Sequence, residues 1–180
     1  MKKILCTLAV ALTSAVLLNA QTYDFTLTFE PEGGGGRTGS GGGTLTLDAG
    51  ASTLTFNDIT WEGISSDFTA THIHGPTAPG GNAGVLYGLS PTYMTLNPDN
   101  RSGTFSGTLP FVDDPNGSGF TVSEQLDQVL ANMWYINIHS DDFGGGEIRG
   151  TIELVPEPST FALLGLGAAG LVCWRFRRRH

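Results

Sequence analysis

The central part of this 180-residue chain lacks cysteine altogether. Its two cysteines, Cys6 and Cys173, lie in apolar segments near the two ends. Residues 21–154 therefore contain no disulfide, and at this length they must form one core that is held by burial of apolar side chains. No cysteine is available there as a nucleophile.

Cationic side chains are almost as rare in the centre. Between residues 21 and 158, three arginines face seventeen aspartates and glutamates, a net charge of −14. The three are Arg37, Arg101 and Arg149. Such a surface repels nucleic acid and anionic lipid, so we expect no nucleic acid among the partners. It suits solubility outside the cell and contact with divalent cations.

The N-terminus is built as an export signal. Two lysines at positions 2 and 3 precede an apolar run over residues 4–18, and small residues surround Ala20. This order is that of a secretory signal peptide, which predicts passage through the Sec translocon and cleavage after Ala20. Residues 1–20 are therefore assigned to the signal peptide.

The C-terminus, residues 155–180, has three parts in a fixed order. A turn motif comes first, an apolar stretch over residues 161–174 follows, and a basic cluster ends the chain. The turn motif is Val155, Pro156, Glu157 and Pro158, and the basic cluster is Arg175, Arg177, Arg178 and Arg179. The apolar stretch approaches the length of a membrane span, and the arginines mark its cytoplasmic side and stop transfer. We therefore predict a C-terminal transmembrane helix with the centre of the chain exported.

These three parts resemble the PEP-CTERM sorting signal of Gram-negative bacteria. The resemblance implies that an exosortase-type enzyme processes the chain near Pro156–Pro158, after transient anchoring in the inner membrane. It also implies delivery to the cell surface or the extracellular matrix. A stable single-pass anchor without processing is the alternative that the residues leave open.

Apolar and polar residues alternate along most of the central region. Residues 23–30, for example, interleave Tyr, Phe, Leu and Phe with Asp, Thr, Thr and Glu. Period two predicts strands with one wet face. Further strands are predicted around Leu45–Leu47 and Leu54–Phe56, and over Phe68–His74, Val85–Leu89, Gly103–Leu109, Trp134–His139 and Glu147–Leu154. We expect an all-β fold, an antiparallel β-sandwich of Greek-key or immunoglobulin-like type.

Two segments depart from the alternation. Residues Ser123–Met133 space their apolar side chains at helical intervals after a serine that can cap, which predicts one short helix at an end of the sandwich. The glycine-rich run over residues 32–43 contributes no packing and is costly to order. It is therefore predicted to be a flexible hairpin loop or linker and not a strand interior.

Three of the four histidines are candidate metal ligands. His72 and His74 project to the same face of a predicted strand, and His139 shares a face of another strand with Tyr135 and Asn137. If the two strands are close, the imidazoles converge, and zinc or copper would take them as ligands at about 2.0–2.1 Å. The candidates for a fourth, oxygen ligand are Asp141, Asp142 and Glu147. Structural packing of the same side chains is the alternative that stays open.

A second group of polar residues has a structural explanation. Glu147 and Arg149 share one face of a predicted strand. We expect Arg149 to fork onto a carboxylate or onto carbonyls near His139. With Asn137, these residues are predicted to form a structural polar cluster.

Calcium is the other ionic candidate. Residues Asp114–Gly119 imitate the opening of a calcium loop, but the twelfth position is Gln125 and the preceding segment is predicted as a strand, so an ordinary turn is expected. Residues 141–147 gather three acids around flexible backbone and are a slightly better candidate, with a solvated turn as the default expectation.

Several sequence blocks resemble the CHRD domain. The recognisable blocks are HIHGP (His72–Pro76), YINIH (Tyr135–His139) and GEIRG (Gly146–Gly150), and they run in the order of that module within residues 21–154. The resemblance implies an extracellular β-sandwich module, and it carries over no catalytic mechanism.

The expected function is therefore binding or structure outside the cell. The sequence has no nucleophile elbow and no phosphate-cradling glycine loop, and we expect neither catalysis nor an obligatory cofactor. An exopolysaccharide or a matrix protein is the expected partner. Two alternatives stay open: a His-ligated zinc or copper protein, including a redox enzyme, and a calcium-dependent adhesion or polysaccharide-binding module.

Overall fold

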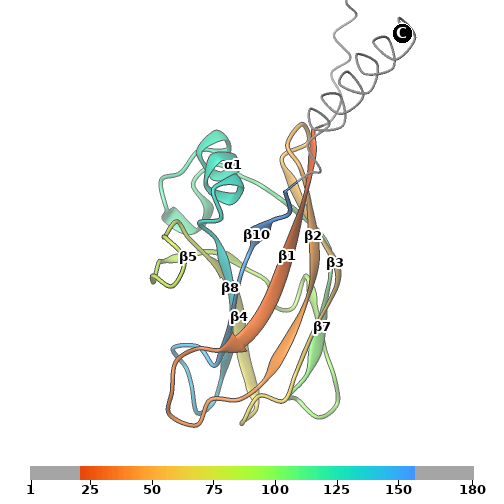
Figure 1. Ribbon diagram of the computed structural model, residues 1–180, viewed down its shortest axis with the longest axis vertical. Helices are drawn as coiled ribbons and strands as arrows, with labels where there is room; N and C mark the ends of the chain where they lie inside the picture. Colours follow the sequence, from red (N-terminus) through yellow and green to blue (C-terminus); the bar gives the residue numbers. More distant parts are fainter. Residues whose placement is uncertain (1–20, 157–180) are drawn as a thin grey trace, which may run out of the picture.

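The structure, a computed structural model, describes residues 21–156 as ten strands, one α-helix and a 3-10 turn (Figure 1). The strands are β1 (Thr22–Pro31), β2 (Ser40–Asp48), β3 (Thr53–Glu62), β4 (Phe68–His74), β5 (Val85–Gly88), β6 (Met94–Leu96), β7 (Gly103–Pro110), β8 (Tyr135–Ser140), β9 (Ile148–Thr151) and β10 (Glu153–Leu154). The helix is α1 (Val122–Leu130), and the 3-10 turn is η1 (Pro115–Gly117). The predicted signal peptide and C-terminal membrane helix lie outside the described residues. Within residues 21–156, no helix has the length and apolar character needed to cross a membrane.

All ten strands belong to one antiparallel sheet, ordered β5-β4-β8-β9-β1-β2-β3-β7-β6 with β10 beside β1. The long strand β1 is the link between its two halves: β10 and β9 pair with successive parts of it, and β2 pairs with its other edge (Figure 1). The all-β prediction is confirmed. The finer prediction of a two-sheet Greek-key sandwich is not confirmed, because β1 runs through both halves and makes them one curled sheet.

The core follows the predicted alternation. Phe25, Leu27 and Phe29 of β1 are buried, while the residues between them are exposed. Trp61 of β3 and Trp134, just before β8, are the largest fully buried side chains. Because no disulfide is available, burial of this apolar surface supplies most of the stabilisation, at about 25 cal/mol per Å².

The glycine-rich run is partly strand, so the prediction of a loop over its whole length is wrong. Gly41, Gly42 and Gly43 lie inside β2 and pair with β1, next to a register shift in the β2–β3 ladder. A Cβ atom at Gly41 would lie 2.2 Å from the carbonyl oxygen of Thr60. These positions need glycine because the strongly curled sheet brings neighbouring backbones too close for a side chain.

Two other boundaries differ from the prediction. The helix begins at Val122, and its N-cap is Thr121 where Ser123 was expected. The reason is a capping box: Thr121 and Glu124 each satisfy a backbone N–H of the other. The predicted last strand is split into β9 and β10, and Glu147 lies outside both.

Strand β8 is buried on both faces, and this places the candidate site. Ile136 and Ile138 point into the core, whereas Tyr135, Asn137 and His139 point to the opposite, outer face and are also buried. An outer face is normally wet. Here loops cover it, so polar side chains are held in a sheltered layer above the sheet.

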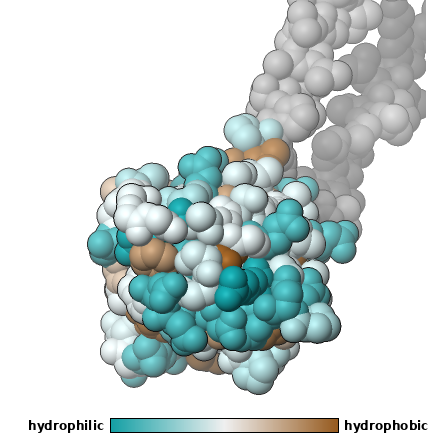
Figure 2. Space-filling view, turned by 90° about the horizontal axis from the view of Figure 1, so that it is seen from below, coloured by the Kyte–Doolittle hydropathy of each residue, from teal (hydrophilic) through white to brown (hydrophobic). Residues whose placement is uncertain are grey.

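Several loops meet at the end of the molecule opposite α1 (Figure 1). The N–H of Phe68, at the start of β4, donates to the Asn100 carbonyl in the loop before β7, at 2.9 Å. The Asp67 carbonyl accepts the N–H of Asp141 at 2.9 Å. Thr38 of the glycine-rich loop donates to the Gly63 carbonyl at 2.8 Å. Figure 2 views the molecule from this end, where hydrophilic side chains predominate.

Candidate metal centre

The register of two neighbouring strands brings the three candidate histidines together. In the β4–β8 ladder, His72 pairs with Asn137 and His74 pairs with Tyr135. His139 follows Asn137 by two residues and therefore points to the same outer face. Cross-strand and diagonal neighbours on one face of an antiparallel pair are within side-chain reach of each other. The sheet thus places all three imidazoles on one patch of its outer face.

The three rings converge on a common point. One ring nitrogen from each of His72, His74 and His139 lies within 4.8 Å of the other two. Nδ1 of His72 and Nε2 of His139 are 3.1 Å apart. The donor atoms of a tetrahedral site with metal–nitrogen bonds of 2.0–2.1 Å are about 3.3 Å apart, so this pair already has the required spacing. The donor of His74 lies within 4.8 Å of both others, so a small shift of the side chains would complete the group.

Backbone carbonyls orient two of the rings from behind. Nδ1 of His74 donates to the Ala83 carbonyl at 3.0 Å, and Nδ1 of His139 donates to the Gly144 carbonyl at 3.0 Å. Each bond fixes the tautomer that leaves Nε2 unprotonated, which is the usual outer-shell arrangement of metal-binding histidines. His139 Nε2 then accepts from Nδ1 of His72. Nε2 of His74 is buried and has no hydrogen-bond partner.

The site is sheltered, which affects protonation. His74 and His139 are 9% and 8% exposed. Burial lowers the pKa of His72 below its ordinary value, and the neighbouring His139 and His74 lower it further. Burial also lowers the pKa of His74, against a weaker opposing effect of its bond to Ala83. Both rings are therefore neutral at pH 7, the form in which imidazole binds a metal.

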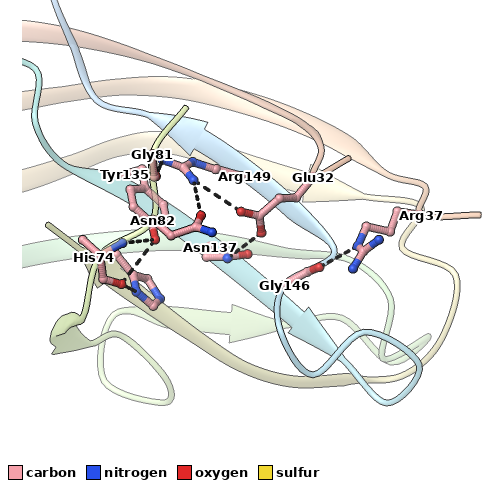
Figure 3. Close-up of polar contacts among 10 residues, drawn as sticks. Glu32, Arg37, His74, Gly81, Asn82, Tyr135, Asn137, Gly146 and Arg149 are labelled. Carbon is pink, nitrogen blue, oxygen red and sulfur yellow. Dashed lines mark hydrogen bonds and ion pairs between the residues drawn. The ribbon is translucent and has the colours of Figure 1, made fainter. Parts of the chain in front are cut away.

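A stack of three planar groups supports His74 (Figure 3). The ring of Tyr135 lies parallel to that of His74, with centroids 4.9 Å apart and an interplanar angle of 7°. The guanidinium carbon of Arg149 lies 3.4 Å from the centroid of the Tyr135 ring. Such cation–π contacts are worth more when they are shielded from water, as here.

Arg149 also holds the loop between β4 and β5. Its Nη2 donates to the Gly81 carbonyl at 2.6 Å, and its Nη1 donates to Asn82 Oδ1 at 3.2 Å and to Glu32 Oε1 at 3.3 Å. The same loop carries Ala83, whose carbonyl orients His74. Arg149 therefore supports His74 in two ways, through the stack and through the loop.

The predicted polar cluster divides into two parts. Asn137 and Arg149 meet at Glu32, because Nδ2 of Asn137 donates to Glu32 Oε2 at 2.8 Å (Figure 3). Glu147 lies apart from them and is fully buried. Its Oε1 accepts the backbone N–H groups of Ser65 at 2.6 Å and Thr38 at 3.2 Å.

Glu147 is ionised in spite of its burial. Burial alone would raise its pKa, but hydrogen bonds, including those from the backbone of Ser65 and Thr38, hold the pKa below the ordinary value. A carboxylate that accepts several backbone N–H groups behaves in this way. Glu147 thus fastens the glycine-rich loop and the β3–β4 loop to the start of β9.

The acidic loops proposed for calcium form turns. Asp114 Oδ1 accepts the N–H of Gly119 at 2.6 Å and so closes the turn around η1. In the β8–β9 loop, Asp141 and Asp142 are exposed, whereas Glu147 points inward. The candidate oxygen ligands therefore do not join the histidines. Within residues 21–156, the three histidines are the group of metal-ligating side chains that converges on one point.

Sequence reasoning missed several residues of the site. Glu32 and Arg37 were placed in a flexible linker, and Tyr135 was noted only for its strand face. Arg37 Nε donates to the Gly146 carbonyl at 2.9 Å, and its guanidinium lies 4.5 Å from the centroid of Phe143. The sequence did offer one signal for Arg37: a region with this excess of acidic residues contains only three arginines, so each of them is a candidate for a specific contact.

The sorting motif is only partly described. Val155 and Pro156 follow β10, and the Val155 N–H donates to the Asp24 carbonyl at 2.8 Å. Glu157, Pro158 and the terminal arginines lie outside the described residues.

Comparison with known families assigns both parts of the chain. The family described as the CHRD domain matches residues 14–152, and the PEP-CTERM protein-sorting motif matches residues 154–179. The fold and the first match define an all-β module of the CHRD class. The chain belongs to the CHRD-domain family, and its C-terminal motif makes it an exported protein that an exosortase sorts to the cell envelope or surface. No curated protein and no solved structure matched the chain.

Proposed function

We propose that this exported CHRD module binds one transition-metal ion, copper or zinc, through His72, His74 and His139. The observation that carries the proposal is the convergence of three ring nitrogens within 4.8 Å on a sheltered face. The unpartnered Nε2 of His74 supports it, because a buried polar atom without a partner is costly unless a ligand satisfies it. The role is binding, without turnover.

The donor set favours copper over zinc. All three donors are imidazole nitrogens, which suit both ions, and for a given nitrogen site Cu²⁺ binds more tightly than Zn²⁺. His72 must exchange its tautomer, because Nδ1 carries the proton that now bonds to His139. The proton moves to Nε2, and a neutral imidazole makes this exchange without a change of charge.

Titration of the full chain, solubilised in detergent, tests the proposal. We expect one Cu²⁺ per chain, with weaker binding of Zn²⁺ in competition. His74→Gln and His139→Gln should each lower copper affinity at least about tenfold, as loss of one of three ligands requires. His180→Gln is the matched control, since it removes the fourth histidine of the chain, which is not one of the proposed ligands. Equal copper binding by the wild type and His74→Gln would exclude the site.

We also propose that the module works outside the cell after processing of its tail. The support is the sorting motif of residues 154–179, which begins at the last residue of β10. Replacement of Pro156 and Pro158 by alanine should retain the unprocessed chain in the membrane fraction. Release of a processed chain from this variant at the wild-type rate would contradict the proposal.

A further inference from the structure

A cleft of about 430 Å³ is lined by His74, one of the three candidate ligands. Its lining includes His74, Asn137 and Gly145. Asn137 is the cross-strand partner of His72, and Gly145 follows the residue whose carbonyl orients His139. The cleft is therefore bounded by groups adjacent to all three imidazoles. Its volume lies in the range of small-molecule sites.

The cleft is locally cationic on a strongly acidic protein. Two of the three arginines between residues 21 and 156 lie at the cleft. Arg37 lines it, and Arg149 donates hydrogen bonds to Glu32 and Asn82, which also line it. Glu32 also lines the cleft, but its charge is compensated by Arg149 at 3.3 Å. The charge of Arg37 has no such carboxylate partner among the described residues. A bound dication would make the cleft still more attractive to anions.

Three protein ligands leave the metal an open position. Divalent copper and zinc generally take four or more ligands, and zinc sites with three protein ligands keep the fourth position for water or an exogenous ligand. Glu32 is not free to fill it, because Arg149 holds its Oε1 and Asn137 holds its Oε2. No other carboxylate of the described residues belongs to the group.

We infer that the cleft binds a small carboxylate, up to the size of a sugar acid, whose oxygen takes the open position on the metal. The inference rests on the proposed metal site. Arg37 supplies the second contact, since a guanidinium N–H makes a charge-assisted hydrogen bond to a carboxylate oxygen. Its Nε and Nη1 bond to the carbonyls of Gly146 and Gly34, which hold the guanidinium in place and leave Nη2 for the ligand.

The test uses the full chain in detergent, loaded with one equivalent of Cu²⁺, and azide as a spectroscopic probe. Azide should give a saturable azide-to-copper charge-transfer band, and both acetate and glucuronate should displace it. Arg37→Gln should weaken azide and acetate binding about tenfold, as loss of one charge-assisted contact predicts. The matched control is Arg101→Gln, which removes an arginine whose side chain is 51% exposed and which does not line the cleft.

The outcomes separate the two proposals. A chain that binds copper without an azide band, or whose Arg37→Gln variant binds azide and acetate as the wild type does, overturns the carboxylate site and leaves the metal site standing. Displacement by acetate alone overturns the assigned ligand size. A chain that takes up no copper overturns the metal site and this inference with it.

Discussion

Nδ1 of His72 and Nε2 of His139 lie 3.1 Å apart, although 66 residues separate the two positions in the chain. Two strands of one ladder hold them there, and the carbonyl of Gly144 fixes the tautomer of His139. Two of the three proposed ligands are therefore already arranged before an ion binds. Such preorganisation lowers the cost of ordering the site on binding.

The metal-free protein should lose stability in mild acid. Burial is the main cause that lowers the pKa of both His72 and His74 below the value near 6.5 of the unfolded chain. Below about pH 6.5 the unfolded chain therefore binds more protons at these two histidines than the folded chain does. The free energy of unfolding is therefore highest above about pH 6.5, as far as these two histidines affect it, and it falls as the pH is lowered below that value. Melting temperatures measured with chelator between neutral and mildly acidic pH should show the decline. The His72→Gln/His74→Gln variant should show a flatter profile, and an unchanged slope in that variant would refute the assignment.

Arg149→Lys should weaken copper binding roughly tenfold, the lower end of the effect of outer-shell changes on metal affinity. Lysine keeps the charge but loses the planar stack on Tyr135 and the forked contacts to Gly81, Asn82 and Glu32. Copper titration at several pH values measures the effect, because a poorly held His74 should also release metal at higher pH.

The control for this change is Arg101→Lys. Arg101 pairs with Asp67 at 3.4 Å on the exposed loop end, where ion pairs contribute little. Copper affinity in this variant should equal that of the wild type. If Arg149→Lys also bound copper with wild-type affinity, Arg149 would have no role in the metal site.

Gly41→Ala should destabilise the fold by about 2–3 kcal/mol, the usual cost of overpacking. The new Cβ atom would meet the Thr60 carbonyl oxygen at 2.2 Å and the Trp61 Cα atom at 2.7 Å. Gly34→Ala is the matched control in the same glycine-rich run, since nothing lies within 4 Å of its Cβ position. Urea unfolding of both variants measures the difference. If the two variants were equally stable, the placement of Gly41 in a strand interior would be wrong.

Glu147→Ala should cost about 2–3 kcal/mol of unfolding free energy, because it leaves the N–H groups of Ser65 and Thr38 without their acceptor. Hydrogen exchange should show faster exchange at these two amides. The exposed neighbour in the same loop, Asp142→Ala, should change stability little. Wild-type protection of Ser65 and Thr38 in Glu147→Ala would contradict this account.

The alternation of apolar and polar residues predicted the strands well. Alternation placed Phe68–His74 at the observed bounds of β4, and it assigned Ile136 and Ile138 to the core. It also put His72 and His74 on one face. These features depend on the period of two, which is a property of neighbouring residues.

Longer-range features did not follow from the sequence. From the sequence alone, the run of glycines predicts a loop. Its strand part could not be predicted, because it depends on the curl of the sheet, which brings Thr60 close to Gly41. Likewise, Glu32 and Arg149 are 117 residues apart, and their contact depends on the pairing of β1 with β9. The Ala83 and Gly144 carbonyls that orient the histidines belong to loops, where side-chain pattern predicts little.

X-ray absorption spectroscopy of the copper-loaded full chain tests the central claim most directly, because it counts the imidazoles bound to the metal. The account predicts three imidazole nitrogens at about 2.0 Å in the wild type, and two after His139→Gln. A first shell of oxygen atoms only, or a spectrum that His139→Gln leaves unchanged, would contradict it.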